Sequence, residues 1–171
     1  MKVSDMRIEL KFKKSSMPGL ATRAYDPDED DIRSILTDVC RMIEPRCNFI
    51  VSAFGQDRWP VDVGTDLPVF LEQLPDVLQA VNAGMATAID FYEQGIERSI
   101  LFSPIDRRYL ASCTSGTAWQ PDPSTEYIDR EDLERMLLAA REEFMRAFAE
   151  AAPNLVAHPW MRHWLESRSA P

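Results

Sequence analysis

The spacing of hydrophobic residues divides the first third of the chain into two strands and one helix. Apolar and charged residues alternate over residues 6–14, which is the period of a half-buried strand with lysines on its outer face. Residues 15–19 then predict a turn or loop. Over residues 32–43 apolar positions recur every three or four residues, which predicts a helix with one apolar face, and Pro45 ends it. Residues 48–55 are a short apolar run and predict an inner strand.

The middle of the chain predicts a second helix and a strand meander. Residues 65–83 have helical spacing, and Gly84 is placed to end the helix in a left-handed conformation. Pro75 removes a backbone donor inside this segment, so a kink or two short helices is expected. Residues 85–93 and 97–113 are rich in β-formers, contain a glycine link and a second turn, and predict three antiparallel strands.

The last segment has the clearest helical pattern. A single apolar stripe begins after Asp129 and ends near residues 151–153, and residues 159–165 predict one more short helix that docks its tryptophans. Together the elements predict an α+β fold in a single domain over residues 1–171. We expect a mainly antiparallel sheet of about five strands, packed against three to four helices, with a long C-terminal helix.

Composition and charge then narrow the class of protein. The chain has 28 Asp and Glu against 19 Lys and Arg, for a formal net charge of −9. Because neutralising phosphates needs a dominant basic face, this balance argues against nucleic acid as a partner. No signal-peptide pattern and no apolar run of about 20 residues is present, and the three cysteines form no CxxC pair. We therefore expect a cytoplasmic protein without a membrane partner.

Metal and cofactor motifs are incomplete in the sequence. The acidic run from Asp26 resembles a calcium loop, but it has Asp31 where that loop needs glycine and Thr37 where it needs a bidentate glutamate. The two histidines, His158 and His163, would lie about 140° apart around a helix, so they do not form a ligand pair. There is no glycine-rich phosphate loop. We predict no cofactor, no metal site and no catalytic residue.

Two alternatives from other functional classes stay open. A small hydrolase or transferase would use Cys113, which follows a predicted strand, or a carboxylate pair such as Asp90 with Glu93 or Glu126 with Asp129. A homo-oligomeric regulatory or structural module would use an exposed strand edge or the C-terminal tryptophans as its interface.

The distribution of charge along the chain is more informative than its total. Residues 57–95 contain seven acids against one base, a sum of −6, whereas residues 1–25 contain six bases against two acids, a sum of +4. An acidic region with aromatic residues suits a basic protein partner, through electrostatic steering and aromatic anchors. The predicted partner-binding residues are Asp57, Trp59, Asp62, Asp66, Glu72, Asp76, Asp90 and Glu93.

Two stretches of the chain resemble segments of small bacterial immunity proteins. These are the decapeptide IDFYEQGIER at residues 89–98 and the run WQPDP at residues 119–123, and the resemblance extends in general arrangement over roughly residues 50–165. Such proteins are the cognate inhibitors of polymorphic, contact-dependent or type VI secreted toxins. The resemblance implies a non-catalytic protein that binds a toxin domain and blocks its active site or substrate channel. It assigns no individual site residue and leaves open whether the chain is a monomer or a homodimer.

Overall fold

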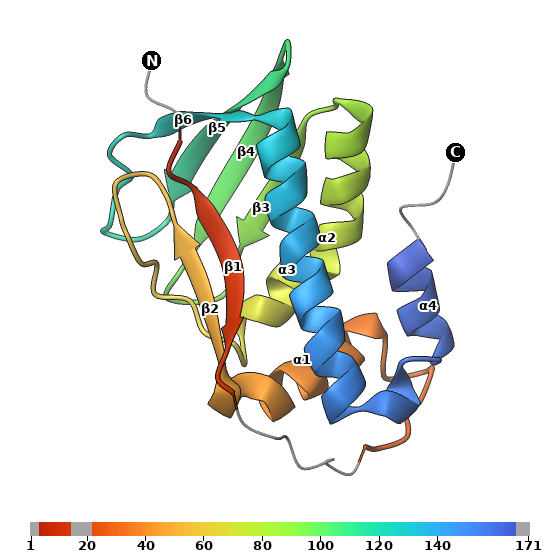
Figure 1. Cartoon of the computed structure of the whole chain (residues 1–171). Coiled ribbons are helices and arrows are strands. Elements are labelled where there is room, and N and C mark those ends of the chain that lie inside the picture. Colours follow the sequence, from red (N-terminus) through yellow and green to blue (C-terminus); the bar gives the residue numbers. More distant parts are fainter. Residues whose placement is uncertain (1–3, 15–21, 167–171) are drawn as a thin grey trace.

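The computed structural model of the chain describes residues 4–14 and 22–166 and has an α+β fold, as the hydrophobic spacing predicts (Figure 1). The loop expected at residues 15–19 lies outside the described residues. The strands are β1 (Arg7–Phe12), β2 (Cys47–Ser52), β3 (Thr87–Phe91), β4 (Arg98–Ile105), β5 (Arg108–Ser115) and β6 (Thr125–Asp129). The helices are α1 (Ile32–Ile43), α2 (Asp66–Ala83), α3 (Arg130–Ala151) and α4 (Pro159–Glu166), with short 3-10 turns at Glu44–Arg46 and Pro153–Leu155.

The six described strands form two antiparallel sheets instead of one sheet of about five strands. β1 pairs with β2, and β3, β4, β5 and β6 follow one another in the second sheet. The prediction of an inner strand at residues 48–55 is therefore wrong, because β2 has only one neighbour. Its apolar run reflects burial by other elements, since the ring of Phe49 packs 5.6 Å from Phe70 of α2 and 6.3 Å from Phe91 of β3.

The helices cover the apolar sides of both sheets and share one continuous core with them. In Figure 1, α3 runs through the middle of the molecule with β1 on one side and α2 on the other. The bounds of α1, α3 and α4 agree with the predicted segments to within a few residues. None of the helices in the described part of the chain is long and apolar enough to cross a membrane.

The helix α2 is continuous through Pro75, so the pair of short helices, one of the two expected outcomes, is wrong. Pro75 has no N–H to donate to the carbonyl of Leu71, four residues earlier. That carbonyl instead accepts a hydrogen bond of 2.8 Å from the indole Nε1 of Trp164 in α4. The predicted end of the helix is confirmed, because Gly84 has φ 68° in the left-handed region.

One side-chain amide forms hydrogen bonds with the backbone of β3 at the outer edge of the four-stranded sheet. Gln73 of α2 donates from Nε2 to the carbonyl of Asp90 (2.9 Å), and its Oε1 accepts from the backbone N–H of Asp90 (2.8 Å). The pair of bonds replaces those of a neighbouring strand. It also fixes α2 against β3, which brings together acidic residues from two distant parts of the sequence.

Candidate functional site

The structure gathers four of the eight predicted binding residues on one face formed by α2 and β3. Glu72 and Asp76 lie one turn apart on α2, and Gln73 between them holds Asp90 at the edge of β3. Glu93 follows β3 and Asp62 precedes α2. We call the set Glu72, Asp76, Asp90, Tyr92 and Glu93 the α2–β3 surface.

Arg33 is the basic residue that the charge count along the sequence missed. It lies in the first turn of α1, and its guanidinium contacts Glu93 Oε1 at 3.0 Å and Glu72 Oε2 at 3.7 Å. It also lies over the ring of Tyr92, 5.4 Å from the ring centroid, while the hydroxyl of Tyr92 donates to Glu72. Burial, with a further contribution from Glu72, raises the pKa of Tyr92 to about 12.

The remaining charge on this face is exposed. Asp76 and Asp90 are exposed, and neither carboxylate forms an ion pair with a residue that the structure describes. The Tyr92 ring beside them is 43% exposed, one of the four large apolar or aromatic residues found at the described surface. The α2–β3 surface thus combines a half-exposed ring with four carboxylates and a single guanidinium.

Two of the predicted partner-binding residues, Asp66 and Trp59, are buried, so neither side chain is available to a partner at the surface. Asp66 is 4% exposed, and its carboxylate accepts a hydrogen bond of 2.8 Å from the backbone N–H of Asp62. Burial raises the pKa of Asp66 to about 6, opposed by that hydrogen bond and reinforced by the charges of Asp62 and Glu93. Asp66 therefore shapes the start of α2, while the exposed Asp62 accepts from Thr65 N at 2.6 Å.

Trp59 belongs to the core and is 2% exposed, so it is not an aromatic residue of the surface. Its indole Nε1 donates to Ala53 O at 3.1 Å. The guanidinium of Arg98, itself 3% exposed, contacts two tryptophan rings, 4.6 Å from the centroid of Trp59 and 3.6 Å from that of Trp119. Arg98 also donates to Gln56 Oε1 at 2.6 Å, and burial lowers its pKa. The aromatic residue expected at the surface is thus a packing partner for a buried cation.

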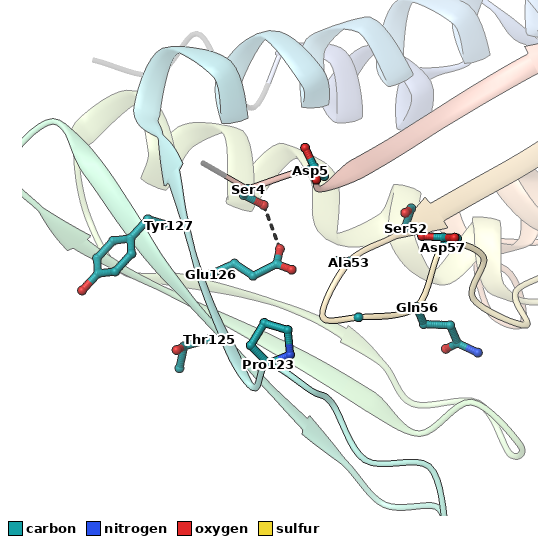
Figure 2. Close-up of a pocket in the computed structure, with 11 residues that line it drawn as sticks. Ser4, Asp5, Ser52, Ala53, Gln56, Asp57, Pro123, Thr125, Glu126 and Tyr127 are labelled. Atoms are coloured by element: carbon teal, nitrogen blue, oxygen red, sulfur yellow. Dashed lines mark hydrogen bonds between the residues drawn. The ribbon is translucent and has the colours of Figure 1, made fainter. Parts of the chain in front are cut away.

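Asp57 lies apart from the α2–β3 surface, at a cavity of about 400 Å³ (Figure 2). Three segments form its walls: the start of the described chain at Ser4, the turn at residues 52–57, and residues 123–127. We call this the acidic cavity. Its central carboxylate is Glu126, which accepts from Ser4 Oγ at 2.7 Å and from the backbone N–H of Phe54 at 2.9 Å.

Sequence reasoning did not find the acidic cavity, since the strand β6 that carries Glu126 was not predicted. Within β6, Glu126 is half-buried, follows the exposed Thr125 and shares a face with the buried Ile128. A carboxylate two residues before a buried apolar residue of the same strand is the sequence signal that could have located this site. The turn at Gly55 is the other requirement, because φ there is +82° and the Asp122 carbonyl packs directly against it.

Cys113, which the alternative enzymatic hypothesis would use, and the histidine His158 both pack against neighbouring residues. Cys113 is buried, and burial raises the pKa of its thiol to about 11, which keeps it protonated at neutral pH. His158 packs edge-on against Tyr25 and Trp160 and accepts from the backbone N–H of Trp160 at 3.2 Å. Within residues 4–14 and 22–166, no group of three His, Cys, Asp or Glu side chains is arranged to hold a metal ion.

No protein-family model, curated protein or solved structure matches the chain.

Proposed function

We propose that the chain is a cytoplasmic, non-catalytic immunity protein that binds the toxin domain of a cognate secreted bacterial toxin and masks its active site. The observation that carries the proposal is the α2–β3 surface, on which exposed carboxylates surround a half-exposed tyrosine. Complementary charge raises the rate of association, and tyrosine is enriched among residues that dominate interface energies.

The charge on this surface also suggests what it would cover. A toxin that acts on nucleic acid has a basic cleft for the phosphate backbone, and an acidic protein surface competes for the same cleft. Asp76 and Asp90 have no ionic partner among the described residues, so both carboxylates are free to meet a basic side chain. Arg33 holds the carboxylates of Glu72 and Glu93, so these two residues give the same surface negative groups in fixed positions.

The buried, protonated Cys113 supports a binding role over a thiol-dependent reaction. A nucleophilic thiol needs access and a lowered pKa, and Cys113 has the opposite of both.

Growth protection is the direct test of the proposal. We expect the gene immediately upstream to encode a large secreted protein with a variable C-terminal domain, and this domain is induced in a bacterial host with and without the full chain. We expect growth arrest by the toxin domain alone, rescue by co-expression, and a purified complex with a defined stoichiometry. Growth arrest that persists in the presence of abundant, folded chain would overturn the immunity proposal.

The role of the α2–β3 surface is tested separately with charge reversal. Asp76→Lys with Asp90→Lys should slow association with the toxin domain at least about tenfold at low salt, and the rate should depend less on salt. The matched control is Glu142→Lys with Glu150→Lys, which makes the same change of charge on exposed positions of α3. Equal slowing by both pairs would exclude a specific role for the α2–β3 surface.

A further inference from the structure

We propose that the acidic cavity binds the guanidinium group of an arginine side chain, presented by the toxin domain. This inference rests on the proposed function for the source of the arginine. The cavity lies at the turn after β2 and at β6, and it is distinct from the α2–β3 surface.

The charge of the lining selects a cation. Three carboxylates contribute to the walls, those of Asp5, Asp57 and Glu126, and no Lys, Arg or His is among the described residues that line the cavity. Asp5 and Asp57 are exposed at the rim, whereas Glu126 is half-buried behind them. A cation that enters would therefore meet carboxylates both at the mouth and inside.

The inner carboxylate is fixed before any ligand arrives. Each oxygen of Glu126 already accepts one hydrogen bond, from the Phe54 N–H or from the Ser4 hydroxyl, and Figure 2 shows the bond from Ser4. A carboxylate oxygen has capacity for a second donor, so both oxygens can still receive the parallel N–H groups of a guanidinium. Because the carboxylate is held in place, little side-chain entropy is lost when it binds.

The hydroxyl of Ser52 is a further polar group on the wall of the cavity. Ser52 lines the cavity and is only 7% exposed, yet its hydroxyl has no hydrogen-bond partner among the residues that the structure describes. Its oxygen is not fully buried, so it faces the open volume of the cavity and is available to a ligand. A ligand donor in the cavity would pair this hydroxyl, which lies beside Asp57 in Figure 2.

The shape of the cavity favours guanidinium over ammonium. Acceptors lie on different walls, at Glu126 on β6 and at Ser52 and Asp57 across from it, and a planar group with five N–H donors can reach several walls at once. Ala53 and Pro123 supply apolar wall for the methylene stem of the arginine. A volume of about 400 Å³ accommodates one side chain and some water, and it is near the small end of ligand sites, which span about 300–1,000 Å³.

The test uses a small arginine probe on the full chain, so it does not depend on the toxin. N-acetyl-arginine-N-methylamide is titrated into ¹⁵N-labelled protein at low salt, with the lysine and citrulline analogues as matched probes. Citrulline keeps the shape of arginine and removes the charge. We expect saturable shifts of the amide signals of residues 52–57 and 125–127 with the arginine probe, weaker binding of the lysine probe and none of the citrulline probe.

Variants locate the binding. Glu126→Gln keeps an acceptor for the Phe54 N–H and removes the charge, so it should weaken the arginine probe about tenfold or more. Asp57→Asn should weaken it by a smaller factor, and the control Glu142→Gln, at an exposed position of α3, should leave it unchanged. Non-saturable shifts, equal binding of citrulline, or full binding by folded Glu126→Gln would each overturn the assignment. Such a result would leave growth protection intact as a separate test of the proposed function.

Discussion

Trp164 donates its indole N–H to the carbonyl oxygen of Leu71, 93 residues earlier in the chain, across 2.8 Å. This oxygen is the one that Pro75 deprives of its helical donor. A side chain from α4 thus completes the hydrogen bonding of α2, and the interruption that proline normally causes is avoided. The relationship ties the stability of α2 to the docking of the C-terminal helix.

Replacing Trp164 by phenylalanine should lower the free energy of unfolding by about 1–2 kcal/mol, since the Leu71 carbonyl is left without a donor. In a Pro75→Ala background residue 75 regains an N–H for that carbonyl, so the same substitution should then cause a smaller loss. Urea unfolding of the four proteins measures the coupling. Equal losses in both backgrounds would show that only ring packing is involved. Trp160→Phe, a partly exposed position in the same helix, is the control.

Asp66 should make stability depend on pH. Its folded-state pKa is raised from 3.8 to about 6, so the folded protein keeps a proton that the unfolded chain has released between about pH 4 and 6. Its contribution to stability therefore falls as pH rises through that window, by at most about 3 kcal/mol, and is constant above it. Asp66→Asn should remove this fall. Unfolding free energies of both proteins from pH 4 to 8 check it, and parallel curves would contradict it.

The turn beside the acidic cavity should not tolerate a side chain at Gly55. A methyl group there would lie 1.8 Å from the Asp122 carbonyl oxygen, and φ is +82°. We expect Gly55→Ala to lose more than about 3 kcal/mol, because the clash adds to the roughly 1–2 kcal/mol of left-handed strain. Gly95→Ala is the matched control, since φ is +101° and no atom lies within 4 Å. Thermal unfolding of both variants separates the clash from the strain, and similar losses would disprove the close approach.

Arg98 should not be replaceable by lysine. Its flat guanidinium contacts the rings of Trp59 and Trp119 while it donates to Gln56, and an ammonium group has neither the flat face nor the weak hydration that burial favours. We expect Arg98→Lys to lose about 2 kcal/mol and to reduce the near-ultraviolet circular dichroism of the tryptophans. The exposed Arg107→Lys should change neither. Wild-type stability of the Arg98→Lys protein would show that the charge alone is required.

The pattern of apolar and polar residues located those elements whose own sequence shows which side is buried. The helix α3 has an apolar stripe over its whole length, and β1 alternates apolar and charged residues, so each could be located from the sequence. The continuity of α2 could not be predicted, because it depends on a donor 93 residues away. The same limit explains β2, since an apolar run reports burial and does not report the number of paired neighbours.

The candidate site followed the sequence only in part, for a related reason. Regional charge located Asp76 and Asp90 correctly in the exposed part of the acidic segment. It did not distinguish the buried Asp66 from them, because burial is decided by packing. It also missed Arg33, which reaches Glu93 from 60 residues earlier, and Glu126, which joins Asp57 only when three segments meet.

The amide of Gln73 has a consequence for the behaviour of the protein at high concentration. A strand with free backbone donors and acceptors is a template on which further copies can add without limit, and Gln73 occupies the donor and acceptor of Asp90 on that edge. Because the bonds come from a side chain, a single substitution at Gln73 would expose the template while leaving the core intact. Gln73, a residue of a helix, therefore blocks strand pairing at Asp90 from outside the sheet.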